Sequence, residues 1–386
     1  MARHRTTVRL AVAGGGTGGH TYPALTTITA VREQLAEHGI ALEVTWYGTK
    51  AGLEAKVAAQ HGIGFRPLAA GKVRRSLKPA ALARTALDLL KVPYGIAQAA
   101  ASLARHRPHV VLSTGGYVAV PVGLAAALTR RRLVMHEQIT TLGLANRLLA
   151  RVATDVALSH PSSLTGLPAR ARRRATVTGN PIRPVLLTGD AARARERHGL
   201  EDALPTVYVT GGAQGAAQIN RLLAAVLPEL LEHCQILHQT GPDHLTTART
   251  RASALPPALA ARYHPVGYVA ERLEDVYAAA DLVIARSGAG TLAELTALAK
   301  PAVLIPLVPT AGHEQQRGAE TLADAGAAVA LVADQATEAR LLDAVLPLLK
   351  DPARRAEMAA RSASLGKPDA ARRLAALVIN RAGITL

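Results

Sequence analysis

The feature that most constrains the fold is a strand, glycine turn and helix sequence that occurs twice, once at the start of each half. In the first half "TTVRLAVA" has the β-branched pattern of a strand, Gly14–Gly19 contains five glycines, and "PALTTITAVREQLAEHG" has helical apolar spacing. In the second half "TVYVT", "GGAQGAAQIN" and "RLLAAVLPELLEH" repeat this order. Strand and helix patterns alternate after each turn, which is typical of parallel sheets covered by helices on both faces.

The sequence therefore predicts an α/β fold of two Rossmann-like parallel-sheet domains facing each other across a cleft. We expect an N-terminal domain at residues 1–183, a linker at 184–204, a C-terminal domain at 205–366, and a C-terminal helix at 367–386 that packs back on the N-terminal domain. The 386 residues, 49% of them hydrophobic, suffice for two cores. Ligands of such sheets bind outside the carboxyl ends of the strands, so we expect the glycine turns to line the cleft.

Composition excludes several classes of function. The net charge of +17 favours anionic partners. Only 3% of residues are aromatic and no nucleic-acid-binding motif is present, so we expect no nucleic acid partner. Cys234 is the only cysteine, which excludes an internal disulfide and cysteine-based zinc sites. The apolar runs are too short for an export signal or a membrane span, and we expect a cytoplasmic protein.

The first glycine turn also matches a dinucleotide-binding pattern. Gly14, Gly16 and Gly19 fit G-x-G-x-x-G, and bare backbone lets a helix N-terminus approach an anion or a sugar. The pattern also requires an acidic residue at the end of the second strand, where "TWYGT" has none. An NAD(P)-dependent oxidoreductase is therefore a minor alternative.

The segment "DLVIARSGAGTLAEL" predicts a phosphate site. Backbone amides of Gly288–Thr291 would lie at a helix N-terminus, where the dipole favours an anion. Glu294 could bind a ribose diol, because a carboxylate accepts two hydroxyl hydrogen bonds. The alternative is a capping box, in which Thr291 and Glu294 close the helix start. Gln315 and Gln316 begin a further helix, and their amides could bind a sugar or a base.

Seven ordered motifs resemble those of the MurG family of peptidoglycan glycosyltransferases: "GGGTGGHTYPAL", "STGGYVAVP", "MHEQITTLGLANRLLA", "VTGNPIR", "VTGGAQGAAQIN", "RSGAGTLAEL" and "GHEQ". The resemblance covers nearly the whole chain. It implies the GT-B fold, with an acceptor-side N-terminal domain and a donor-binding C-terminal domain. It also implies transfer of N-acetylglucosamine (GlcNAc) from UDP-GlcNAc to lipid-linked N-acetylmuramyl-pentapeptide, lipid I, which gives lipid II.

The resemblance implies an inverting displacement without a metal or other cofactor. The 4-hydroxyl of N-acetylmuramic acid (MurNAc) would attack the anomeric carbon as UDP leaves, and His20 would take the hydroxyl proton, since imidazole has a suitable pKa. Glu137 is the second candidate base, and a purely structural His20 is the alternative. The implied donor-binding residues are Thr17, Gly18, Gly19, Arg183, Ala213, Gln214, Gly267, Tyr268, Gly288, Ala289, Gly290, Thr291, Glu294 and Gln315. The implied acceptor-binding residues are Gly15, Gly16, Gly115, Gly116, Tyr117 and Asn146.

A lipid diphosphate acceptor implies contact with a membrane surface. Residues 70–95 combine basic and apolar side chains, which suits peripheral binding to the anionic inner face of the plasma membrane. The relevant side chains are Lys72, Val73, Arg74, Arg75, Leu77, Lys78, Leu82 and Arg84. An amphipathic helix with a solvated basic face is the alternative. The oligomeric state stays open.

Three positions depart from the family pattern, and each lacks an expected polar group. Ala213 stands where the family usually has serine, Ile139 where asparagine commonly follows "HEQ", and Gly318 where asparagine is usual. A lost sugar-binding hydrogen bond can change specificity strongly. A related enzyme with another nucleotide sugar or acceptor, in a secondary pathway, is therefore one alternative. A catalytically silent scaffold that still binds UDP is another.

Overall fold

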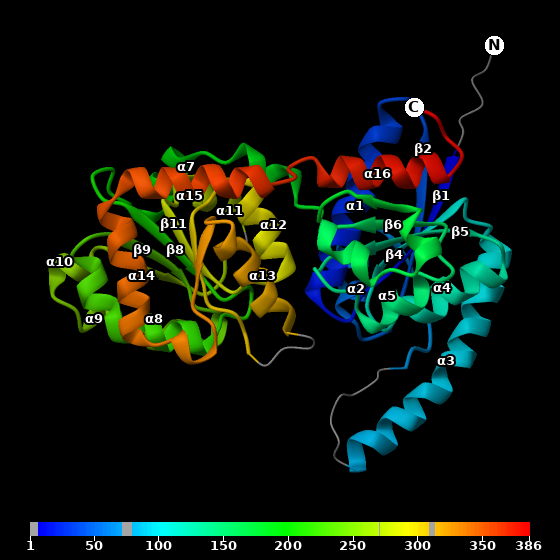
Figure 1. Cartoon of the computed structure of the whole chain (residues 1–386), viewed down its shortest axis with the longest axis horizontal. Coiled ribbons are helices and arrows are strands. Elements are labelled where there is room, and N and C mark those ends of the chain that lie inside the picture. The colour runs from blue at the N-terminus through cyan, green and yellow to red at the C-terminus, as the bar shows by residue number, and fades with distance from the viewer. Residues whose placement is uncertain (1–6, 72–78, 270, 309–312) are drawn as a thin grey trace. The chain divides into compact units, whose positions relative to one another are not determined.

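The structure is a computed structural model that describes residues 7–71, 79–269, 271–308 and 313–386 (Figure 1). It divides into two compact units. Unit 1 comprises Met1–Ile182 and Asp369–Leu386, and unit 2 comprises Arg183–Pro368.

Unit 1 contains a seven-stranded parallel sheet in the order β3-β2-β1-β4-β5-β6-β7. Its strands are β1 Thr7–Gly14, β2 Ala41–Gly48, β3 Gly64–Pro67, β4 Val110–Gly115, β5 Arg132–Glu137, β6 Asp155–Leu158 and β7 Ala175–Val177. Its helices are α1 Gly18–Ala36, α2 Leu53–Gln60, α3 Pro79–His106, α4 Ala119–Leu128, α5 Leu144–Leu149, η1 Pro161–Gly166, α6 Ala169–Arg172 and α16 Ala370–Arg381.

Two hydrophobic cores cover the two faces of this sheet. Alternate residues of β1 point to opposite faces. Leu10 and Val12 belong to the core that contains α1 and α16, whereas Ala11 and Ala13 belong to the core that contains residues of α3 and α4. The β4 strand contributes to both cores in the same way. The near-continuous burial of these strands is the pattern of a parallel sheet with both faces covered.

The C-terminal helix α16 packs against α1 in unit 1 (Figure 1). Its buried side chains Leu374, Val378 and Ile379 lie in the same core as Ile28 of α1. Two side chains tie it further to the unit: the guanidinium of Arg381 donates to the carboxylate of Asp155 at 2.7 Å, and Arg132 donates to the Arg381 carbonyl at 2.8 Å.

Unit 2 contains a six-stranded parallel sheet in the order β10-β9-β8-β11-β12-β13. Its strands are β8 Thr206–Thr210, β9 Gln235–Gln239, β10 Tyr263–Val266, β11 Leu282–Ala285, β12 Ala302–Leu304 and β13 Ala328–Ala330. Its helices are η2 Pro184–Thr188, α7 Ala191–His198, α8 Ala217–Leu231, η3 Pro242–His244, α9 Leu245–Ser253, α10 Pro257–Ala260, α11 Leu273–Ala279, α12 Ala289–Ala297, α13 Glu314–Asp324, η5 Ala333–Gln335, α14 Glu338–Lys350 and α15 Pro352–Leu365.

Residues 184–204, expected as a linker, instead form part of unit 2. They contain η2 and α7, and both pack against α11. Ala194 and Leu200 are buried with Ala279 in a small core. Asp275 of α11 accepts from the backbone N–H of Asp190 and from the Arg193 guanidinium, both at 2.8 Å. This segment is therefore folded and attached to unit 2.

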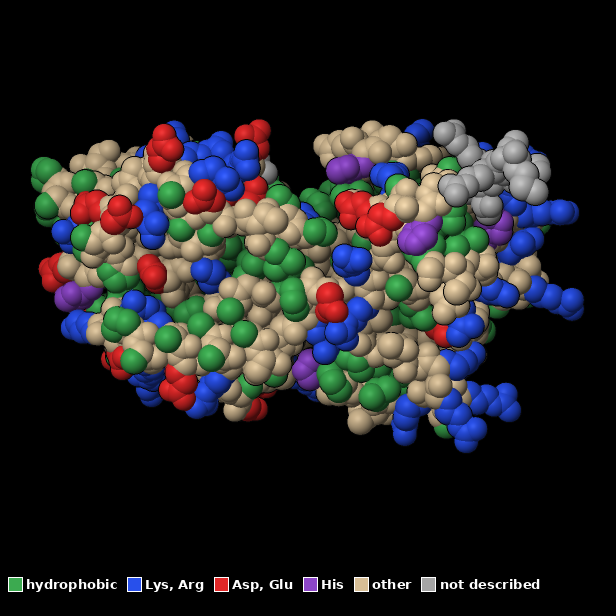
Figure 2. Space-filling model, turned by 90° about the horizontal axis from the view of Figure 1, so that it is seen from above, with side chains coloured by type: hydrophobic (Ala, Val, Ile, Leu, Met, Phe, Trp, Pro, Cys, Tyr) green, Lys and Arg blue, Asp and Glu red, His purple; other side chains and the backbone are tan. Residues whose placement is uncertain are grey.

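Among the described residues no helix is both long enough and apolar enough to span a bilayer. On the face drawn in Figure 2, Lys and Arg side chains cover more of unit 1 than Asp and Glu do. The basic residues 72–78 that we expected to meet a membrane lie outside the described part of the chain, as do the side chains of Leu82 and Arg84.

Candidate active site

Both sheets reverse their strand order at one point, and the glycine-rich segments lie there. In unit 1 the reversal falls between β1 and β4, so the turns after Gly14 and Gly115 are adjacent. In unit 2 it falls between β8 and β11, which the turns at 211–215 and 286–290 follow. The crevice at such a switch point is where ligands of open α/β sheets bind. The topology therefore gives each unit one candidate site.

His20 is fixed in unit 1 through one of its ring nitrogens. Its Nδ1 lies 2.8 Å from the Thr114 carbonyl oxygen and 3.1 Å from Oε1 of Gln138. Both partners are acceptors, so Nδ1 carries the hydrogen and the lone pair is on Nε2. Burial lowers the pKa of His20, against the opposing effect of these two hydrogen bonds. The neutral imidazole thus presents an unprotonated Nε2, to which no described residue donates.

Gln138 orients His20 and is itself held by neighbours. Its Nε2 donates to the Thr114 carbonyl at 2.7 Å and to Nδ1 of His136 at 3.1 Å, which leaves Oε1 facing His20. His136 is fully buried, and its Nε2 lies 3.0 Å from the Gly179 carbonyl. Desolvation lowers the pKa of His136 to about 4, so this ring is neutral near pH 7. Sequence reasoning missed Gln138, although it stands in the "HEQ" motif.

The carboxylate of Glu137 accepts hydrogen bonds from the segment that follows it. It accepts from the backbone N–H groups of Ile139 at 3.2 Å and Gly143 at 3.0 Å, and from Nδ2 of Asn146 at 3.0 Å. Burial raises the pKa of Glu137, and these three donors oppose that rise. Both carboxylate oxygens of Glu137 therefore fix residues 139–146 in place. The hydrogen bond from Asn146 to Glu137 positions the Asn146 side chain.

The predicted acceptor-side glycines surround His20 at close range. Gly115 and Gly116 have φ values of +90° and +82°, which favour glycine. A Cβ on Gly115 would lie 3.3 Å from the His20 ring, and one on Gly116 would lie 2.3 Å from the Gly15 carbonyl oxygen. Gly16, at φ +85°, packs on the ring of Tyr117. The structure thus brings these four glycines, Tyr117, Asn146 and His20 together.

Thr17, Gly18 and Gly19, predicted on the donor side, form the start of α1 beside this group. The Thr17 carbonyl accepts from the backbone N–H and the hydroxyl of Thr21, at 3.1 and 2.9 Å. Thr17 is the N-cap residue, but its side chain makes no capping hydrogen bond. The His20 side chain does not cap the helix either, because it is directed to Thr114 and Gln138.

Glu54 of α2 is a second residue that sequence reasoning missed. Its side chain is fully buried, and its Oε2 accepts from the backbone N–H of Gly16 at 3.0 Å. Its Oε1 accepts from the N–H and the hydroxyl of Thr49, at 2.9 and 3.0 Å. The backbone N–H of Gly16, to which a dinucleotide phosphate would bind, therefore already donates to the Glu54 carboxylate. Only its place after "GTKAG" at the end of a strand could have indicated this role.

In unit 2 the turn after β8 is fixed by Gln239. Gly212 and Gly215 have φ values of +90° and +72°. Nε2 of Gln239 donates to the Gly212 carbonyl at 2.9 Å, and its Oε1 accepts from the backbone N–H of Val269 at 2.9 Å. Val269 follows Gly267 and Tyr268, so one side chain connects both of these predicted segments. Tyr268, Ala213 and Gln214 are exposed.

Glu294 faces the interior of unit 2, and its Oε2 accepts from the Tyr277 hydroxyl at 2.8 Å. Burial raises the pKa of Glu294, whereas the Tyr277 hydrogen bond and the charge of Arg183 lower it. The α12 helix begins at Ala289 with Gly288 as N-cap and no side-chain capping bond. The capping-box alternative is therefore wrong, because Thr291 is already inside the helix.

Gln315 lies beside the turn that precedes α12. Its Oε1 accepts from the backbone N–H of Leu307 at 3.0 Å, and its carbonyl accepts from the Ser287 hydroxyl at 2.7 Å. Its side-chain NH₂ donates to no residue that the structure describes. Gln315 therefore has two hydrogen-bond donors available next to Gly288–Thr291.

One of the three unusual positions has a structural explanation. Gly318 is buried in α13, where a Cβ would lie 2.5 Å from a methyl carbon of Leu292, so the glycine permits close packing on α12. The backbone of Ile139 donates to Glu137 and accepts from the Ser163 hydroxyl, contacts that any side chain allows. Nothing in the structure explains Ala213.

Two family models match the two halves of the chain. The glycosyltransferase family 28 N-terminal domain matches residues 10–158, and the glycosyltransferase family 28 C-terminal domain matches residues 206–374. The crystal structure of Acinetobacter baumannii MurG superposes with a TM-score of 0.72 at 24% identity, covering 97% of this chain and 99% of that one. The fold is therefore GT-B, as predicted, and the class is a glycosyltransferase.

Proteins named UDP-N-acetylglucosamine--N-acetylmuramyl-(pentapeptide) pyrophosphoryl-undecaprenol N-acetylglucosamine transferase are similar over nearly their whole length. The one from Halorhodospira halophila is 39% identical over 371 residues, 95% of this chain and 97% of the relative. The one from Desulforudis audaxviator is 36% identical over 373 residues, 94% of this chain and 95% of the relative. The chain belongs to this family, the MurG family. The resemblance noted in its motifs is confirmed, and the oxidoreductase alternative is wrong.

Proposed function

We propose that this enzyme transfers GlcNAc from UDP-GlcNAc to the MurNAc 4-hydroxyl of undecaprenyl-diphosphate-linked muramyl-pentapeptide, converting lipid I to lipid II. The observation that carries the proposal is the unprotonated Nε2 of a fixed, neutral His20 among closely packed glycines at the switch point of the sheet. The attacking hydroxyl loses its proton as UDP leaves, so the reaction needs a base and a site for the diphosphate.

His20 supplies the base in this proposal. Its Nε2 takes the proton from the 4-hydroxyl as the oxygen attacks the anomeric carbon from the side opposite UDP. The imidazolium that forms is stabilised by Nδ1–H donation to the Thr114 carbonyl and to Gln138. Glu137 acts as a positioning residue, because its oxygens hold the loop that carries Asn146.

Unit 2 supplies the donor site. Backbone amides at the start of α12 and Gly212–Gly215 face the diphosphate and stabilise the charge that grows on UDP. Arg183, whose charge already acts on Glu294, adds a cation. Glu294 accepts from the ribose hydroxyls, Gln315 donates to the donor sugar, and the backbone near Gly267 and Tyr268 binds uracil.

Glu294→Ala tests the donor site. We expect UDP to bind about 10–100-fold more weakly, because charge-assisted hydrogen bonds to the ribose are lost. Calorimetric titration with UDP measures this, and mass spectrometry of UDP-GlcNAc with a short-chain lipid I analogue measures transfer. Glu229→Ala, an exposed glutamate of α8, is the control. Unchanged UDP affinity in Glu294→Ala would remove the ribose role. A wild-type enzyme that binds UDP but forms no GlcNAc product would point to another donor or acceptor.

The lipid acceptor requires that the enzyme reach an anionic membrane surface. The described part of α3 supports this, because Leu90 and Tyr94 are 73% and 63% exposed and lie four residues apart on one helix face. Lys91, also exposed, pairs with Asp88 beside them. Apolar side chains next to basic ones suit interfacial binding.

Replacing both Leu90 and Tyr94 with serine is expected to weaken binding to vesicles of anionic lipid about tenfold or more, because their apolar surface no longer enters the interface. Vesicle co-sedimentation measures the partition. Leu128→Ser is the control, since Leu128 is 71% exposed at the end of α4. Equal binding by the double variant and the control would exclude this face of α3 as the membrane contact.

A further inference from the structure

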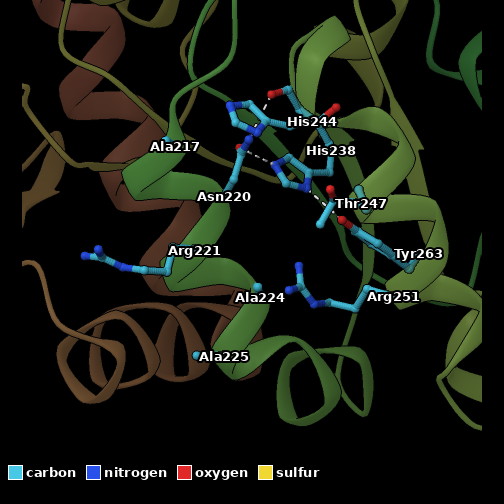
Figure 3. A pocket seen from close by; sticks show the side chains of 12 residues that line it. Ala217, Asn220, Arg221, Ala224, Ala225, His238, His244, Thr247, Arg251 and Tyr263 are labelled. Carbon is cyan, nitrogen blue, oxygen red and sulfur yellow. Dashed lines mark hydrogen bonds between the residues drawn. The ribbon is translucent and has the colours of Figure 1, made fainter.

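Unit 2 contains a groove that the transfer reaction does not use. It lies between α8 and α9, has a volume of about 410 Å³, and is lined by residues of both helices and of β9 and β10 (Figure 3). Four alanines on its walls leave this space open: Ala217, Ala224, Ala225 and Ala248. The volume falls within the range of small-molecule sites and exceeds what a bare phosphate needs.

The floor of the groove is a fixed chain of hydrogen bonds centred on His238 (Figure 3). Nδ2 of Asn220 donates to the Thr240 carbonyl at 2.9 Å, so its Oδ1 faces Nε2 of His238 at 3.0 Å and accepts from it. Nδ1 of His238 then accepts from the Tyr263 hydroxyl at 2.8 Å. Desolvation lowers the pKa of His238 to about 3, and the ring stays neutral. The floor is therefore polar, rigid and uncharged.

The side chains above this floor carry positive charge. Arg221 of α8 and Arg251 of α9 line the groove together with His244 and Thr247. In Figure 3 Arg251 extends toward α8, whereas Arg221 extends away from Arg251. Neither guanidinium forms an ion pair or a hydrogen bond with any residue in the described part of the chain. No aspartate or glutamate is among the groove residues. Guanidinium groups bind phosphate through paired N–H donors, and a hydroxyl adds a further donor.

The groove and the proposed donor site use different sides of β9. His238 and Gln239 are consecutive, so their side chains point to opposite faces of the sheet. Gln239 holds Gly212 and Val269, whereas His238 forms the floor of the groove. The groove is nonetheless coupled to the glycine turn, because Gly215 packs on the Thr240 carbonyl that Asn220 binds.

We propose that this groove binds a small phosphorylated molecule of the size of a sugar phosphate, at a site separate from the one for UDP. The phosphate binds the guanidinium of Arg251, which extends into the groove toward α8 (Figure 3), and the remainder lies against the alanine walls. Asn220 and Thr240 connect an occupied groove to the turn at Gly212–Gly215, so the ligand would modulate donor binding.

Calorimetric titration with glucose 6-phosphate, on enzyme saturated with UDP, tests the site. We expect binding of glucose 6-phosphate but not of glucose, a loss of about tenfold or more in Arg251→Gln, and a smaller loss in Arg221→Gln. Ala224→Phe fills the groove without changing charge and should abolish binding. Arg249→Gln is the matched control, because Arg249 is exposed on α9 but does not line the groove. Thermal unfolding establishes that each variant is folded.

Three results would overturn the proposal. These are no heat of binding up to ~10 mM glucose 6-phosphate, far above a millimolar Kd, an equal loss in Arg249→Gln, and binding that disappears when UDP is present. The last result would mean that the probe occupies the donor site. Because binding is measured without turnover, the outcome does not depend on whether the enzyme makes lipid II.

Discussion

His20→Gln is expected to lower kcat about 10²–10⁴-fold, the usual contribution of a general base, while UDP affinity stays nearly unchanged. Glutamine keeps a polar side chain of similar reach, but its amide cannot take a proton at neutral pH. The proton of the 4-hydroxyl then has no acceptor at the position that Nε2 now occupies. Steady-state kinetics with a soluble lipid I analogue and calorimetry with UDP separate the two effects.

The pH profile gives an independent check on the same residue. Burial lowers the pKa of His20 below its usual 6.5, so the ring loses its proton at a lower pH than a free imidazole. A base works only when unprotonated, and the acidic limb of kcat/KM should therefore have its midpoint below pH 6.5. This acidic limb should be absent from the residual activity of His20→Gln.

His38→Gln serves as the control, because His38 is exposed and, among the residues that the structure describes, its Nδ1 bonds only to the Gln34 carbonyl. If kcat of His20→Gln equals that of the wild type, His20 is structural and the base must be sought elsewhere. Glu137 would then be next, although its carboxylate already holds three donors.

Glu54→Ala is expected to lower the unfolding free energy by about 1–3 kcal/mol, because it removes a buried side chain and leaves the N–H groups of Gly16 and Thr49 without their acceptor. Activity should fall as well, since the glycine turn around His20 loses the contact that fixes it, and small displacements of catalytic groups are costly. Urea unfolding and kcat measure the two effects.

Glu54→Gln should fall between the wild type and Glu54→Ala, because one amide oxygen is retained while an NH₂ group meets one of the donors. Glu33→Ala, an exposed glutamate of α1, should change neither quantity. Wild-type stability in Glu54→Ala would mean that water replaces the carboxylate, and Glu54 would lose its role as the support of the turn.

Local patterns predicted the two sheets well but could not predict which distant side chains meet. The strands expected before the two glycine turns occur as β1 and β8, whereas the sequence did not predict β3. Its "GFRP" has no apolar alternation and ends in proline, which an edge strand tolerates. The glycine turns could be predicted from the sequence, because a positive φ or a close backbone approach selects glycine at that position.

Contacts between side chains that are distant in the sequence cannot be predicted from a local pattern. Glu54 meets Gly16 across 38 positions, and Tyr277 meets Glu294 from another helix. Thr291 and Glu294 fit a local capping pattern, yet the tertiary contact with Tyr277 determines where the carboxylate points. The order of the motifs could identify the family, whereas the protonation state of His20 required its two acceptors.

Helix α16 makes the folding of unit 1 dependent on a segment that is synthesised after all of unit 2. Leu374, Val378 and Ile379 complete a core whose other members come from the first strands and from α1. On the ribosome, all of unit 2 must emerge before that core can close. The N-terminal half is thus made first but completed only after unit 2, and the apolar face that α16 covers stays exposed until that helix emerges.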